Sequence, residues 1–130
     1  MDSKNVMIYA CSGASDLGEV SDKTARKLRD SGFGKMSCLA ALGAGEASYV
    51  ETAKAGSVLI IDGCGVACGR KIAEKAGVRA IVHTLTDMGY VKGKTPPEAK
   101  VIAEIADKLM RAGNPAGKGN ETAGSCGCGK

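Results

Sequence analysis

Short apolar runs alternate along the chain with longer segments in which apolar residues recur at helical spacing. Residues 58–61 form the clearest run, which is uninterrupted and free of charge, as expected for a strand at the centre of a parallel sheet. Residues 6–10 form another run, which ends at a Cys-Ser-Gly turn. Further strands are predicted over residues 35–42 and 79–85, which gives a sheet of about four strands.

A helical pattern follows each predicted strand. The first of these helices is predicted over residues 21–30, with Ser21 as its N-cap. Two more are predicted over residues 46–55 and 67–76, each followed by a glycine, and a last one begins at Pro97. The order βαβαβαβα predicts an α/β fold: a single-domain open parallel sheet, flavodoxin-like or Rossmann-like, with helices on both faces.

Length and composition agree with one globular domain. The chain has 130 residues, of which 44% are hydrophobic and 25% charged, and both fractions are ordinary for a soluble domain. We predict that residues 1–111 form the α/β domain. Residues 112–130 are rich in glycine and carry no large apolar residue, so they are predicted to form a flexible tail, which contains Cys126-Gly127-Cys128.

The charge pattern excludes some classes of partner. The formal net charge is +4, and the Lys and Arg residues are spread along the chain. Because nucleic-acid binders usually show a basic stripe with interleaved aromatic residues, we expect no nucleic-acid partner. The polar residues 1–5 precede an apolar run that is too short for a signal peptide or a membrane span. A cytoplasmic location without a membrane partner is therefore expected.

The six cysteines need an explanation other than disulfide bonds, because structural disulfides are rare in the cytoplasm. Cys11 follows the first predicted strand, and Cys64 follows the third. Cys68 begins the next helix, whereas Cys38 lies within or near the second strand. Because the carboxyl ends of parallel strands meet at one edge of the sheet, we expect these four cysteines to lie there together.

Four thiolates form a complete tetrahedral shell for Zn²⁺. The helix N-terminus predicted at Cys68 also suits a thiolate ligand. The predicted function is therefore a zinc-binding protein in which Cys11, Cys38, Cys64 and Cys68 hold the ion, either as a structural element or for metal handling. For any single one of these cysteines, inert packing in the core is the alternative.

Three segments carry a family resemblance: Tyr-Ala-Cys-Ser-Gly-Ala-Ser at 9–15, Lys-Met-Ser-Cys-Leu-Ala at 35–40, and Ile-Asp-Gly-Cys-Gly-Val-Ala-Cys at 61–68. With them the chain resembles the DGC-domain family, whose members are regarded as zinc-binding proteins. The resemblance excludes the tail. It implies that Cys11, Cys38, Cys64 and Cys68 are the family's four cysteines, thought to hold zinc, and it implies no known reaction.

A second hypothesis is a thiol enzyme. The stretch from Cys64 to Arg70 fits the C-x5-R pattern of cysteine phosphatases and some arsenate reductases, in which loop amides and the arginine bind an oxyanion while the thiolate attacks. Lys71 stands where those enzymes usually have Ser or Thr, and Asp87 is a weak candidate for the general acid. A third hypothesis is an iron–sulfur cluster held by the four cysteines.

A few other residues have two interpretations each. Asp62 either orients the site or caps its own turn, and the cap is favoured slightly. The loop after the first strand, residues 12–15, fits a tight turn better than an anion cradle. His83, the only histidine, is more typical of a hydrogen-bonded or surface residue than of a metal ligand. Cys126 and Cys128 are either accessory ligands for a soft metal or incidental cysteines of the tail.

Overall fold

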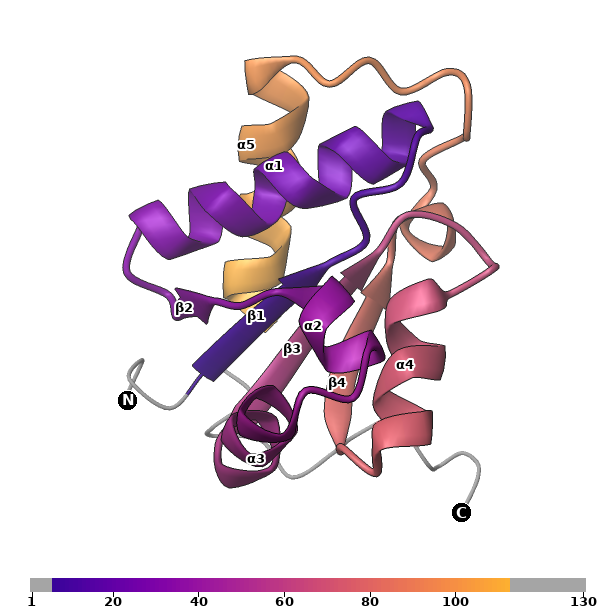
Figure 1. Cartoon of the computed structure of the whole chain (residues 1–130). Coiled ribbons are helices and arrows are strands. Elements are labelled where there is room, and N and C mark those ends of the chain that lie inside the picture. The colour runs from indigo at the N-terminus through magenta and orange to yellow at the C-terminus, as the bar shows by residue number, and fades with distance from the viewer. Residues whose placement is uncertain (1–5, 113–130) are drawn as a thin grey trace.

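A computed structural model describes residues 6–112 and shows a four-stranded, all-parallel sheet in the order β2-β1-β3-β4 (Figure 1). β1 pairs with β3 along its whole length, from Val6 opposite Ser57 to Ala10 opposite Ile61. The strands are β1 (Val6–Ala10), β2 (Lys35–Met36), β3 (Ser57–Asp62) and β4 (Ala80–Thr84).

Helices cover both faces of the sheet, and each face has its own apolar core. α1 and α5 pack on one face, over Ile8, Leu59 and Ile61, whereas α2, α3 and α4 pack on the other, over Tyr9 and Ile60 (Figure 1). The predicted α/β architecture is thus confirmed. The helices are α1 (Asp16–Asp30), α2 (Leu39–Gly43), α3 (Ala47–Ala55), α4 (Cys68–Ala76), the 3-10 helix η2 (Leu85–Met88) and α5 (Ala99–Ala112).

α1 begins earlier than predicted. Its N-cap is Ser15, whose Oγ accepts a hydrogen bond from the Gly18 N–H at 3.2 Å. Ser21 was predicted as the cap and is instead fully buried in the middle of the helix. The prediction was wrong because Gly18 resembles a helix breaker in the sequence. In the structure Gly18 is required, since a Cβ at this position would collide with the backbone of Gly13.

The predicted second strand, residues 35–42, is mostly not a strand. β2 ends at Met36, and Cys38 then becomes the N-cap of the short helix α2. The last helix begins at Ala99, two residues after Pro97. The other predicted strands and helices agree with the structure to within a residue or two. Beyond Ala112, the predicted tail with Cys126 and Cys128 lies outside the described residues.

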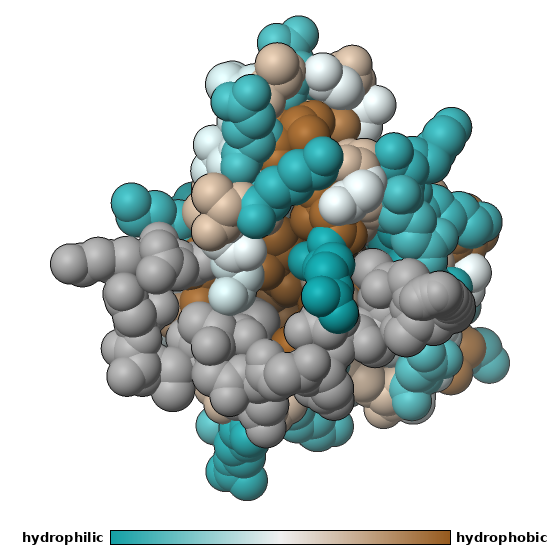
Figure 2. All heavy atoms as spheres, turned by 90° about the horizontal axis from the view of Figure 1, so that it is seen from below, coloured by the Kyte–Doolittle hydropathy of each residue, from teal (hydrophilic) through white to brown (hydrophobic). Residues whose placement is uncertain are grey.

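Within residues 6–112, no helix is long and apolar enough to cross a membrane. Figure 2 views the molecule from below relative to Figure 1. Apolar residues show near the centre of this face, with hydrophilic residues above and beside them. The buried apolar residues form the two core layers on either side of the sheet, as expected for an α/β domain.

Candidate functional site

The strand order brings three cysteine-bearing loops together. The chain leaves β1 toward β2 on one side and later adds β3 and β4 on the other side. Such a reversal creates a crevice between β1 and β3 at the carboxyl edge, which is where open α/β sheets bind ligands. Cys11 follows β1 and Cys64 follows β3, so they flank the crevice, and Cys38 follows the neighbouring strand β2.

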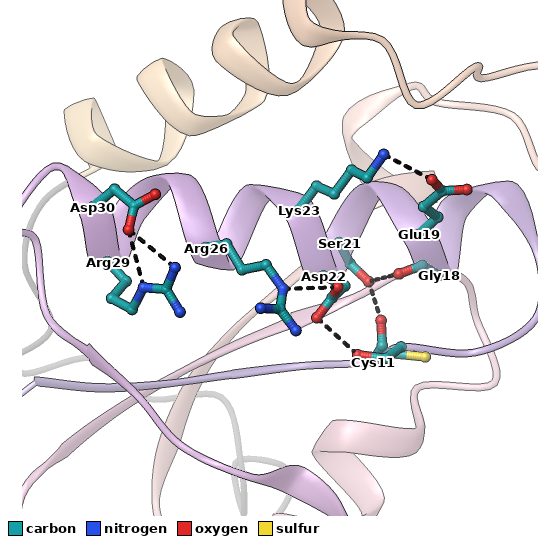
Figure 3. A network of polar contacts seen from close by, with 10 residues as sticks. Cys11, Gly18, Glu19, Ser21, Asp22, Lys23, Arg26, Arg29 and Asp30 are labelled. Atoms are coloured by element: carbon teal, nitrogen blue, oxygen red, sulfur yellow. Dashed lines mark hydrogen bonds and ion pairs between the residues drawn. The ribbon is translucent and has the colours of Figure 1, made fainter.

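Helix α1 fixes the loop that carries Cys11. The Cys11 N–H extends the pairing of β1 with β3 by donating to the Ile61 carbonyl at 3.0 Å, and Ser21 Oγ donates to the Cys11 carbonyl. Ser12 Oγ donates to Asp22 Oδ1 at 3.1 Å. Figure 3 shows Ser21 and Asp22 side by side on α1, directed at this loop. The buried Ser21 therefore positions the site, which explains a hydroxyl in the core.

Cys38 sits at the junction between β2 and α2. The preceding Ser37 N–H still donates to the Ile8 carbonyl of β1 at 2.9 Å, which ties the junction to the sheet. Cys38 Sγ accepts a hydrogen bond from the Ala41 N–H at 3.4 Å, within the range of weak sulfur hydrogen bonds. The side chain is exposed and thus accessible to a metal ion.

Asp62 holds the end of the loop that carries Cys64 and Cys68 in place through hydrogen bonds. This carboxylate is fully buried at the end of β3, and its two oxygens accept hydrogen bonds from the Gly69 N–H at 2.8 Å and the Arg70 N–H at 3.0 Å. It therefore caps the N-terminus of α4, seven residues further on, rather than its own turn. Burial raises the pKa of Asp62, and the two N–H donors and the nearby Arg70 charge oppose that rise.

The backbone around this loop has little freedom. Gly69 is required, because a Cβ there would lie 2.5 Å from Ile60 Cγ2 and 2.8 Å from Asp62 Oδ1. Ala67, just before α4, has a φ of 54°, in the left-handed region that non-glycine residues seldom adopt. Its N–H donates to the Cys64 carbonyl at 2.9 Å and closes a turn. Together these contacts hold Cys68 in the first position of α4.

A pocket of about 880 Å³ opens at this edge and is lined by Cys11, Cys38 and Cys68. Cys64 is half-buried and is not among the lining residues. The sequence made Cys38 the least certain of the four, yet Cys38 shares the pocket and Cys64 does not. The rest of the lining consists of Ala10, Ser12, Gly13, Asp22, Arg26, Arg29, Met36, Ser37, Leu39, Ala40, Tyr49 and Ile72.

The thiols are grouped but not arranged as a ligand shell. All four cysteines are free rather than paired in disulfides. Among residues 6–112, no three or more His, Cys, Asp or Glu side chains are already placed to hold a metal ion. Coordination by all four cysteines therefore requires a local rearrangement of the loops that carry them.

Sequence reasoning missed the charged wall of the pocket. Asp22, Arg26 and Arg29 project from α1, and Arg26 Nε contacts Asp22 Oδ2 at 3.0 Å. Figure 3 shows both arginines on the side of α1 that faces the Cys11 segment, while Lys23 lies on the other side. Positions 22, 26 and 29 follow the i, i+4, i+7 spacing of one helix face, so the signal was present in the sequence.

The structure weighs against the oxyanion-binding alternative. In phosphate-binding loops the amides at the start of a helix remain available to the anion. Here the Gly69 and Arg70 amides are taken by the Asp62 carboxylate, whose negative charge would also repel an oxyanion. Arg70 and Asp87 are exposed, and neither lines the pocket.

His83 lies apart from the cysteines. It pairs with Ile61 in the register of β3 and β4 and is half-buried on the edge strand. Burial lowers the pKa of His83, so its imidazole is neutral near pH 7. It is not among the residues that line the pocket.

Comparison with known proteins identifies the family. The model of the DGC domain matches residues 7–109, which contain all of the sheet except Val6, together with Cys11, Cys38, Cys64 and Cys68. The chain belongs to the DGC domain family. A curated relative of this DGC domain is the anaerobic and virulence modulator AnvM of Pseudomonas aeruginosa PAO1. It is 30% identical over 115 residues, which cover 86% of this chain and 88% of AnvM. No solved structure matches the chain.

Proposed function

We propose that this DGC domain binds Zn²⁺ through the thiolates of Cys11, Cys38, Cys64 and Cys68. The observation that carries the proposal is the grouping of three of these thiols around one open pocket at the switch point of the sheet. Free thiols on adjacent loops can supply the soft ligands that zinc prefers. The same positions belong to the segments through which the chain resembles its family.

The surroundings suit a negatively charged centre. Four thiolates and one Zn²⁺ carry a net charge of −2, and the guanidinium groups of Arg26 and Arg29 stand on the wall of the same pocket. The two guanidinium groups offset the mutual repulsion of thiolates gathered at one site.

Cys64 would join the other three after its loop changes. Gly65 and Val66 between the two cysteines are exposed, so this part of the loop can move without disturbing the core. The hydrogen bonds from Gly69 and Arg70 to Asp62 lie after Cys68 and can persist, whereas the turn closed by the Ala67 N–H and the Cys64 carbonyl would open. Because no three metal-binding side chains within residues 6–112 are yet placed to hold an ion, the loops with Cys11 and Cys38 would adjust as well.

The site supports a metal-handling role better than a structural one. Both core layers are complete without a metal ion, and their buried residues come from the strands and helices. Cys38 and Cys68 are exposed, which leaves the ion open to exchange with other ligands. AnvM is named a modulator, and we likewise assign no reaction to this chain.

The test is metal content of the full-length reduced chain, measured by plasma mass spectrometry after purification without chelators. We expect about one zinc per chain. The variant with Ser at positions 11, 38, 64 and 68 should carry none, whereas a C126S/C128S variant should retain the metal. A metal-free parent with reduced thiols, or equal zinc in the quadruple variant, would contradict the proposal.

A further inference from the structure

The pocket at the cysteine edge has the size of a small-molecule site and two walls of different character. It measures about 880 Å³, within the range of about 300–1,000 Å³ that is typical of such sites. One wall is formed by α1, which covers one face of the sheet, and the other by α2, α3 and α4, which cover the opposite face. The side chains on each wall define what the pocket can hold.

The α1 wall carries an excess of positive charge. Its charged side chains are Asp22, Arg26 and Arg29, so two positive charges stand against one negative charge. Arg26 and Arg29 lie on the same side of α1, the side that faces the Cys11 segment (Figure 3). Because a guanidinium group binds a carboxylate through two parallel hydrogen bonds, this wall suits a ligand with a single carboxylate.

The existing contacts leave both arginines available to a ligand. Arg26 Nε donates to Asp22 Oδ2 at 3.0 Å, and because an arginine has five N–H donors, this contact leaves others for a carboxylate. Arg29 contacts Asp30 at 3.0 Å, but 66% of the Asp30 side chain is exposed, and a pair this exposed contributes little to stability. A ligand carboxylate can therefore compete for Arg29 at small cost.

The second wall is apolar. Leu39 of α2 and Ile72 of α4 pack against the core and also line the pocket. Tyr49 of α3 lines the pocket as well, and 40% of it is exposed, which is unusual for a large hydrophobic residue in the described part of the chain. Contact with an apolar group would remove these side chains from water, so this wall favours a ligand with an apolar body.

We infer that the pocket binds a small organic monocarboxylate with an apolar body. The carboxylate lies on Arg26 and Arg29, and the body lies against Leu39, Tyr49 and Ile72. Two walls of this kind would hold the ligand in one orientation, with its charge toward α1. None of these contacts involves a cysteine or a metal ion, so binding of the carboxylate does not depend on zinc.

Titration of the full-length reduced chain with 2-naphthoate, followed by amide NMR, tests the inference. 2-Naphthoate carries one carboxylate on two fused rings, and it should shift the amide signals of residues 39, 49 and 72 until they saturate. Two probes separate the two ends of the ligand. 2-Naphthamide has the same rings without the charge, and acetate has the charge without the rings. Each should bind about tenfold or more weakly than 2-naphthoate.

Variants of each wall give a second measurement. R26Q and R29Q each abolish the excess positive charge of the α1 wall and should weaken binding of 2-naphthoate about tenfold, as expected for one lost charged contact. Y49A should weaken it roughly two- to tenfold through the lost aromatic contact. K23Q removes a positive charge from the other side of α1 and should bind like the parent (Figure 3).

The inference is overturned if 2-naphthoate produces no saturable shifts, if 2-naphthamide binds as tightly, or if R26Q, R29Q or Y49A binds 2-naphthoate like the parent. The amide spectrum of each variant checks its fold, and the comparison of probes on the parent needs no variant. Zinc content, measured in the same samples, decides only the proposed function. A zinc-loaded chain that ignores 2-naphthoate overturns this inference alone, and a zinc-free chain that binds it overturns the zinc proposal alone.

Discussion

Replacing Asp62 by Asn tests the lock between β3 and α4. The substitution keeps the shape of the side chain but turns one acceptor oxygen into an N–H donor. One of the two amides that now bind the carboxylate, Gly69 or Arg70, then faces another donor in a fully buried place. A lost hydrogen bond to a charged acceptor, with a donor left unsatisfied, costs about 1.5–3 kcal/mol. Relief of the buried charge offsets part of this cost, so we expect a net loss of about 1–2 kcal/mol.

The measurement is urea unfolding of the parent and D62N at pH 7. D107N serves as a matched control, because Asp107 is exposed on α5, and its loss should change stability by less than about 0.5 kcal/mol.

A second readout comes from the pH dependence of stability. Because burial raises the folded-state pKa of Asp62, the folded parent takes up this proton before the unfolded chain does. The difference in free energy of unfolding between the parent and D62N should therefore increase as the pH falls through the folded-state pKa of Asp62 toward the ordinary pKa of an aspartate. Equal stabilities at pH 7, or an advantage that narrows on acidification, would refute the reasoning.

Other predictions concern the glycines, the α1 N-terminus and the metal. G69A should lose about 1–3 kcal/mol because its Cβ would meet β3 at 2.5 Å, whereas G65A, with no atom within 4 Å, should be nearly neutral by the same unfolding assay. Asp16 accepts hydrogen bonds from the Gly93 and Thr95 amides, which lower its pKa, so its contribution to stability is present above the ordinary pKa and is lost as pH falls through the folded value. D16N should accordingly speed hydrogen exchange at those two amides near pH 7, and unchanged exchange would exclude this anchoring role. Chelation of zinc should leave the melting temperature nearly unchanged if the site handles metal; a large drop would instead identify a structural ion.

The main features of the fold could be predicted because they depend on local patterns. Apolar runs and helical spacing identified the strands and helices, and alternation alone implied a parallel sheet. The start of α1 could not be predicted because glycine has a low helix propensity, so Gly18 argued against a helix there. In the structure Gly18 is required by its close contact with the loop at Gly13, which is a tertiary contact. The end of β2 could not be predicted because Cys38 serves as a helix cap, a role in which Ser, Thr, Asp or Asn is usual.

The site was predicted in part. The rule that ligands bind at the carboxyl ends of parallel strands was enough to gather Cys11, Cys38 and Cys68. It could not show that Cys64 is absent from the lining of the pocket, because the rule places the strand ends and not the path of the loop after β3. For Asp62 the sequence slightly favoured a cap of its own turn over a role in orienting the site, because partners seven and eight residues away on another element leave no local signal.

The carboxylate of Asp62 gives this domain a tethered anion of its own. Strand–loop–helix units of this shape use the first amides of the helix to capture phosphate in many proteins. In this chain those amides already donate hydrogen bonds to the Asp62 carboxylate, so they are not available to a phosphate ligand. The strand–loop–helix unit therefore holds the end of its loop in a fixed position and does not bind an anion. The exposed side chain at the start of α4 is that of Cys68, whose sulfur is a type of ligand that soft metals prefer, whereas the first amides of the helix are not available to phosphate.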